Sequence, residues 1–149
     1  MRITALLGCA MLLAGCSTKE TPPVADTTAI APAPAMSLAR IAGTWKVIMK
    51  PERQDTVVSS YVLDTSDSTS WTITFPNGLR AAVRVTGLSG DTVLAATDWN
   101  LSPIRKGLLA RSDIKYWMQD GKLVGTHLAH YKTTGPDTVR VFVVEGTKQ

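Results

Sequence analysis

The chain has 149 residues, a length that favours one domain, and a formal net charge of +4 from 16 basic and 12 acidic residues. The excess of basic residues is small and scattered, which excludes the continuous basic face that nucleic-acid binding needs. Both cysteines, Cys9 and Cys16, lie in the first sixteen residues. The remainder of the chain therefore excludes disulfides, thiolate nucleophiles and Cys-ligated zinc.

Residues 1–15 have the pattern of a signal peptide. Arg2 supplies a positive charge, and an apolar run that is interrupted only by Thr4 extends to Gly15. A membrane-spanning helix needs about 20 apolar residues, so this run is too short to remain in the bilayer as an anchor. It ends in Leu-Ala-Gly followed by Cys16, which resembles the lipobox of bacterial lipoproteins.

The lipobox resemblance implies cleavage before Cys16 and attachment of the lipid anchor to its thiol. Acyl burial contributes about 0.8 kcal/mol per CH₂, so two or three chains hold the protein on a membrane permanently. Ser17, in place of an aspartate, resembles the signal for the outer membrane facing the periplasm. The alternative is an ordinary signal peptide that happens to end beside a cysteine.

Residues 16–37 comprise the lipidated Cys16 and a Pro-, Ala- and Thr-rich tether. The segment after Cys16 contains four prolines and no apolar period, so it cannot bury enough surface to fold. At about 3.1 Å per residue, it reaches up to ~60 Å from the membrane.

Residues 38–149 have the pattern of an all-β domain. A helical turn over residues 38–43 ends at Gly43 and is followed by eight β segments. Four of these alternate clearly between apolar and polar residues, at 45–50, 71–75, 81–86 and 114–119. The other four are β-branched and apolar, at 56–63, 92–99, 122–131 and 138–145.

The connections between these segments predict hairpins. Asp120-Gly121 is the strongest two-residue turn signal, and Pro76-Asn77-Gly78 also turns the chain tightly. No segment has a helical period long enough for a crossover helix, so parallel pairing is disfavoured. Closure removes the exposed edges of a sequential sheet. We therefore expect an eight-stranded antiparallel up-and-down (meander) barrel.

Gly43-Thr44-Trp45 after a helical turn, with a meander of eight strands, resembles the lipocalin and fatty-acid-binding-protein (calycin) barrels. The resemblance implies that Trp45 packs across the barrel floor under a basic residue of the last strand. Arg140 is the first candidate for this residue and Lys148 the second. Fatty-acid-binding proteins hold the ligand carboxylate with an Arg-x-Tyr on that strand. The matching stretch here, Arg140 to Phe142, lacks the hydroxyl, and the helical lid of those proteins is absent.

The aromatic residues are candidates to line an apolar cavity in this barrel, together with Trp45. They are Tyr61, Trp71, Tyr116 and Phe142. The alternative is that they fill the core of a small barrel, in which large side chains alternate with small ones.

No pattern in the chain indicates catalysis, a cofactor or a metal. His127 and His130, three residues apart on one strand, point to opposite faces and cannot share a metal ion. We expect both to be ordinary surface or rim histidines. A pairing such as Asp98 with His127 lacks the context of a nucleophile elbow, and no paired carboxylates support glycoside chemistry. We therefore expect a protein that is not an enzyme.

Two functions follow from these expectations. The first is a carrier of a small apolar or amphipathic ligand in the envelope, with a cavity of about 300 Å³ or more. The second is an interaction module, an inhibitor of an exported enzyme or a structural protein, with a filled barrel. Its working surface would be the connector 99–107, which places Trp99 near Arg105 and Lys106. Trp99 folded back over a barrel end is the alternative for that side chain.

Overall fold

The structure, a computed structural model, describes residues 37–149. The predictions for the signal peptide, for Cys16 and for nearly all of the tether lie outside the described residues. The elements are α1 (Leu38–Ile41), β1 (Thr44–Pro51), β2 (Ser59–Asp64), β3 (Trp71–Thr74), β4 (Arg80–Ser89), β5 (Thr92–Thr97), β6 (Asn100–Leu101), β7 (Leu109–Gln119), β8 (Lys122–Tyr131) and β9 (Val139–Lys148).

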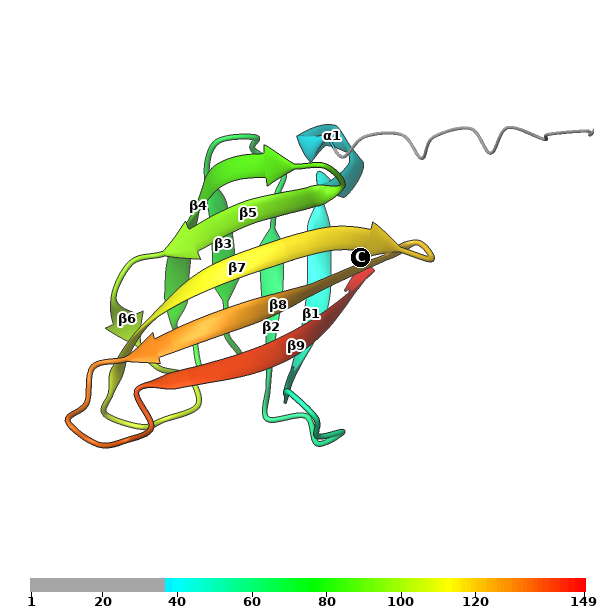
Figure 1. The fold of residues 1–149 in the computed structure, drawn as a ribbon. Coiled ribbons are helices and arrows are strands. Elements are labelled where there is room, and N and C mark those ends of the chain that lie inside the picture. Colours follow the sequence, from blue (N-terminus) through cyan, green and yellow to red (C-terminus); the bar gives the residue numbers. More distant parts are fainter. Residues whose placement is uncertain (1–36) are drawn as a thin grey trace, which may run out of the picture. The chain divides into compact units, whose positions relative to one another are not determined.

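Eight of the strands form a closed antiparallel barrel, as the sequence predicts (Figure 1). Consecutive strands pair with one another, β1 pairs with β9 to close the ring, and β5 pairs with β7. The two-residue strand β6 is an addition at the edge of β7, within the connection between β5 and β7. The main ring therefore has no unpaired edge along its length.

The core lies inside this ring because apolar residues alternate with polar ones along most strands. On β1, Trp45, Val47 and Met49 are buried, whereas the residues between them point outward. All buried hydrophobic residues among those described belong to α1 or to the barrel strands. The domain thus carries a core of its own, which supports folding without the preceding segment.

The hairpin predicted between β7 and β8 is confirmed. Gln119 pairs with Lys122 across the turn. Asp120 (φ 50°) and Gly121 (φ 76°) both occupy the left-handed region. A two-residue turn of this kind matches the twist of the two strands that it joins.

The second strand begins later than predicted. The sequence pattern places it over residues 56–63, but β2 starts at Ser59, which pairs with Met49. Val57 and Val58 are exposed in the loop. Val58 still donates its N–H to the Met49 carbonyl (2.9 Å), but β1 ends at Pro51, so the residues before Val58 have no neighbouring strand to pair with.

Candidate functional site

The floor of the barrel is built around Trp45, as the resemblance implies. Trp45 is buried, and its indole Nε1 donates a hydrogen bond to the Ile41 carbonyl oxygen of α1 (2.8 Å). The Lys148 ammonium lies 5.6 Å from the centre of the Trp45 ring, within the range of a cation–π contact. Gly43 has φ 125°, and a Cβ there would meet Lys148 Cε at 3.0 Å. The glycine therefore leaves room for the lysine that crosses to the ring.

The basic partner of Trp45 is Lys148, so the first choice of Arg140 is wrong and the second is right. Lys148 lies opposite Trp45 in the β1–β9 ladder. Arg140 is near the other end of β9, where it is exposed and donates a hydrogen bond to Asp137 Oδ2 (2.8 Å). One strand cannot bring both of its ends to the same end of a barrel, and the ladder register decides which residue reaches the floor.

Thr65 completes this end of the barrel, and the sequence analysis did not identify it. Its buried hydroxyl donates to the Ile41 carbonyl and lies 2.9 Å from the Gly43 carbonyl oxygen, while its N–H donates to the same Gly43 oxygen (2.8 Å). The hydroxyl thus supplies a hydrogen-bond donor to carbonyl groups that have no N–H partner because helix α1 is so short. Only its position directly after β2 would have hinted at this role.

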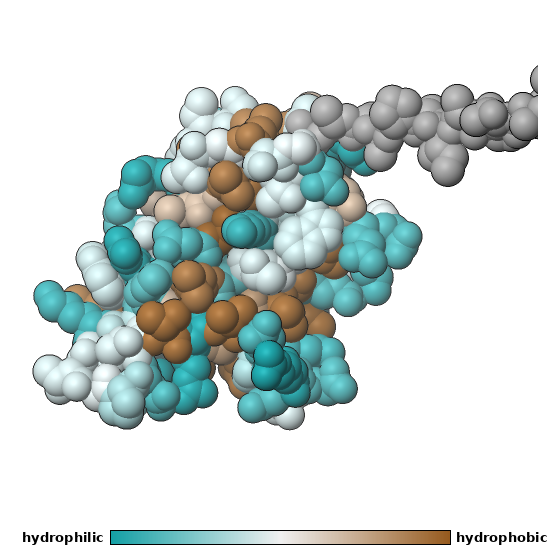
Figure 2. Space-filling view, viewed as in Figure 1, coloured by the Kyte–Doolittle hydropathy of each residue, from teal (hydrophilic) through white to brown (hydrophobic). Residues whose placement is uncertain are grey.

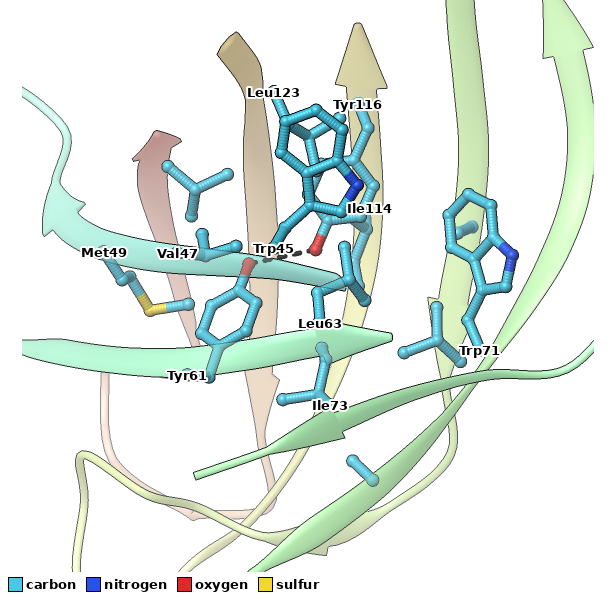
Figure 3. Packing of buried hydrophobic residues seen from close by; sticks show 14 of the residues in the cluster. Trp45, Val47, Met49, Tyr61, Leu63, Trp71, Ile73, Ile114, Tyr116 and Leu123 are labelled. Atoms are coloured by element: carbon cyan, nitrogen blue, oxygen red, sulfur yellow. Dashed lines mark hydrogen bonds between the residues drawn. The ribbon is translucent and has the colours of Figure 1, made fainter. Parts of the chain in front are cut away.

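The four aromatic residues that were predicted to line a cavity all lie inside the barrel and are buried. They are Tyr61, Trp71, Tyr116 and Phe142. The Trp71 ring centre lies 6.3 Å from that of Tyr116, and the Trp71 indole N–H is buried without a hydrogen-bond partner. Figure 3 shows the rings of Tyr61, Trp71 and Tyr116 among aliphatic side chains of other strands. Tyr61, Trp71 and Tyr116 thus belong to a packed core, whereas Phe142 also lines a small cavity.

Two of these tyrosines form a buried polar cluster with His127. The Tyr61 and Tyr116 hydroxyls are 2.9 Å apart, as the dashed line in Figure 3 marks. His127 Nε2 lies 3.0 Å from the Tyr61 hydroxyl and 2.9 Å from that of Tyr116. His127 Nε2 can take part in one hydrogen bond along its ring plane, either as donor or as acceptor. At most two of the three short contacts can therefore be hydrogen bonds at the same time.

Burial keeps the groups of this cluster uncharged. Desolvation lowers the pKa of His127 to about 3, so its imidazole is neutral at physiological pH. Desolvation also raises the pKa of Tyr61 and of Tyr116 well above the usual range for tyrosine. The cluster therefore holds neutral hydrogen-bonding groups in the core, and an added proton would be strongly disfavoured.

The prediction that His127 is a surface or rim residue is wrong. Its side chain points into the barrel and is buried. His130 points outward, and its Nε2 lies 2.9 Å from Asp113 Oδ2. The two histidines thus occupy opposite faces of β8, as their spacing predicts. Asp98 lies outside the barrel, where it pairs with Arg84 (2.8 Å), away from His127.

A small cavity lies inside the barrel, next to this cluster. Its volume is about 50 Å³, and it is lined by apolar side chains together with polar ones such as His127, Ser112 and Tyr131. A water molecule occupies about 30 Å³ in the liquid, so this space suits one or two waters. It is well below the about 300 Å³ that a carrier of a small apolar molecule requires.

The connector after Trp99 covers this end of the barrel. Ser102 is buried, and Ile104 packs against the core. Arg105 lies 4.8 Å from the centre of the Tyr131 ring and donates a hydrogen bond to the Asp137 carbonyl (2.7 Å). The middle of the predicted interaction loop therefore closes the barrel end.

Trp99 itself stays on the outer surface. Its side chain is 46% exposed, and the Arg111 guanidinium lies 5.6 Å from the centre of its ring. Lys106 is also exposed. The structure therefore brings Trp99 together with Arg111, a residue that the sequence analysis did not pair with it, and places Arg105 in the cover of the barrel end.

A wide hollow lies on the outside of the barrel wall. It has a volume of about 580 Å³ and lies between the loop after β1 and the outer face of β7, β8 and β9. Ile48, Val124 and Val143 contribute apolar surface, and Lys50 and Glu145 contribute opposite charges.

No protein-family model, no curated protein and no solved structure matches the chain. The closed meander of residues 44–148 is compatible with a calycin-like architecture. Within residues 37–149, no group of three acidic, histidine or cysteine side chains is arranged to hold a metal ion. No helix in this described part has the length and apolar character needed to cross a bilayer.

Proposed function

We propose that the chain is a non-catalytic, lipid-anchored module of the cell envelope, which binds its partner through the outside of a lipocalin-like barrel. The small internal cavity is the observation that carries this proposal. Aromatic and aliphatic side chains occupy the interior, and about 50 Å³ is left beside His127. An apolar molecule of ordinary size would have to displace packed side chains to enter.

The outer surface supports the same conclusion. The exposed hydrophobic side chains among the described residues include Trp99, Leu101, Leu109 and Val139, which belong to one end of the barrel. Hydrophobic residues also gather over β7, β8 and β9 in Figure 2, among hydrophilic ones. Exposed apolar side chains that lie next to one another on a small domain are typical of an interaction site.

Native mass spectrometry of the tag-free soluble domain, residues 37–149, tests the choice between the two functions. We expect the mass of the protein alone, because the interior has no room for a lipid. The contrasting ligand-carrier function predicts a population with a stoichiometric small molecule that disappears on unfolding. Such a population would overturn the filled-barrel proposal.

The proposal of a lipid anchor rests on the lipobox-like segment Leu-Ala-Gly followed by Cys16, and on the apolar run before it. Ser17 supports placement in the outer membrane, facing the periplasm. Metabolic labelling with radioactive palmitate in a Gram-negative host provides the measurement. We expect the label in the full chain and none in Cys16→Ser, whereas Cys9→Ser keeps it. An unlabelled parent chain would contradict lipidation.

A further inference from the structure

Two rows of outward side chains meet at the covered end of the barrel. In one row, Leu101 of β6 lies opposite Leu109 of β7. In the other, Arg111 of β7 is stacked near the Trp99 ring and lies opposite His130 of β8. Lys132 continues the first row, since its N–H donates to the Leu109 carbonyl (2.9 Å). Exposed apolar side chains and cations therefore alternate over one continuous area.

This area, called the end patch below, consists of three apolar and five basic residues. They are Trp99, Leu101, Leu109, Arg105, Lys106, Arg111, Lys132 and Arg140. Two carboxylates adjoin it, Asp113 and Asp137, each bound to a neighbouring side chain, while Asp98 beside Trp99 is neutralised by its ion pair with Arg84. The end patch with these two acids carries a net charge of +3, out of +4 for residues 37–149. Most of the net positive charge of the domain is thus at this end.

We infer that the end patch binds the surface of an anionic lipid bilayer. This inference rests on the proposal that the barrel works from its outside. A tryptophan edge and leucine side chains suit the boundary between headgroups and acyl chains, where amphipathic rings are enriched. Lysine and arginine around them attract anionic headgroups, and each contributes only within a Debye length of the surface. The combination matches a membrane more closely than an acidic soluble protein, which would leave the leucines unmatched.

The position of the end patch is compatible with a tethered domain. α1, where the described chain begins, lies at the opposite end of the barrel from β6 (Figure 1). The longest strand, β7, has eleven residues and spans roughly 37 Å at ~3.4 Å per residue. The predicted tether reaches up to ~60 Å. A chain that is anchored at Cys16 can therefore turn its end patch onto the same membrane.

Vesicle co-sedimentation of the soluble domain, residues 37–149, tests the inference. The probes are vesicles of phosphatidylcholine alone and vesicles with ~30% phosphatidylglycerol. We expect binding at least tenfold stronger to the anionic vesicles at low salt, falling as the salt concentration rises. Fluorescence of the domain should shift to the blue on binding as Trp99 leaves water.

Matched variants locate the contact. Lys106→Gln with Lys132→Gln should weaken anionic binding by about tenfold or more, since each cation near the surface contributes. Trp99→Ser should remove the blue shift. The charge control is Lys46→Gln with Lys122→Gln, because Lys46 lies on β1 and Lys122 starts β8 at the opposite end of the barrel from Leu109. The apolar control is Leu88→Ser, which is equally exposed at the opposite end of the barrel. All these side chains are exposed, so an unchanged thermal midpoint should confirm the fold of each variant.

Three results would overturn the inference, with different consequences for the proposed function. Equal binding by the patch and control variants would show that the lipid contact lies elsewhere. Binding to polyglutamate but to neither vesicle would identify an acidic protein as the partner, which leaves the proposed function in place. Binding to neither would also remove the end patch as the working surface of the proposed module.

Discussion

Acidification from pH 7 to pH 4.5 is expected to lower the free energy of unfolding of the barrel by about 3 kcal/mol. The reason is His127, which is buried against Tyr61 and Tyr116 and whose pKa is lowered to about 3 by desolvation. In the unfolded chain, its pKa returns to about 6.5. Between pH 6.5 and pH 3, His127 binds a proton in the unfolded state but remains unprotonated in the folded state.

The direction of the effect follows from this difference. The folded state keeps its full stability from this group above pH 6.5, and it loses stability as the pH falls toward 3. The hydrogen-bonded carboxylates behave separately. Asp64 and Glu145 have lowered pKa values, through bonds to Ser66 and Lys122, so their contributions to stability are lost mainly at lower pH than that at which the imidazole of the unfolded chain takes up its proton. The interval from pH 6.5 to 4.5 therefore reports mainly on the buried imidazole.

Urea unfolding at a series of pH values measures this effect. His127→Gln, which keeps a hydrogen-bonding side chain but cannot take up the proton, should flatten the dependence between pH 6.5 and 4.5. His130→Gln is the matched control, since His130 lies on the outer face of the same strand. It should keep the dependence of the parent. A parent domain that is equally stable at pH 7 and 4.5 would contradict the burial of a neutral His127.

Replacing Gly125 by alanine is expected to destabilise the barrel by about 3 kcal/mol or more. Gly125 lies opposite Tyr116 in the β7–β8 ladder. A Cβ at this position would come within 2.2 Å of the Lys115 carbonyl oxygen and 2.9 Å of Tyr116 Cδ1. The backbone at Lys115 cannot move far enough without breaking the hydrogen bonds between β7 and β8. Tyr116 cannot turn away without losing its contact with His127.

Gly87→Ala is the matched control for this substitution. Gly87 also lies on a strand, at the irregular pairing between β4 and β5, but a Cβ there would meet no atom within 4 Å. Its effect on the free energy of unfolding should stay within about 1 kcal/mol. Thermal or urea unfolding of the two variants beside the parent gives the comparison. Equal stability of the two alanine variants would contradict the packing of Tyr116 over Gly125.

Local patterns were sufficient for the parts of the fold that depend on neighbours in the chain. Trp71 and Ile73, on β3, alternate with threonines and face the core as predicted. The turn at Asp120-Gly121 was recognisable because few residue pairs favour two successive left-handed conformations. The prediction of an antiparallel barrel then followed from the short loops and from the fact that closure removes exposed sheet edges.

The sequence was less informative about β8 and about the ends of the barrel. In β8, apolar residues occur on both faces, since Leu123 is buried while Val124 and Leu128 point outward. The pattern therefore did not reveal which face His127 occupies. Likewise, both Arg140 and Lys148 were available on the last strand, and only the register of β9 against β1 places Lys148 beside Trp45.

The amino-acid order alone determined the strand sequence and the antiparallel pairing, because periodicity and turn residues act over a few neighbouring residues, whereas the floor position of Trp45 was implied by the resemblance to calycin barrels. Tertiary structure alone decided that the interior is filled, that a histidine lies among two tyrosine hydroxyls, and that exposed apolar and basic residues meet at one end. These features arise where strands far apart in the chain come into contact. Their geometry depends on ladder register and on the volumes of facing side chains, neither of which a single segment encodes.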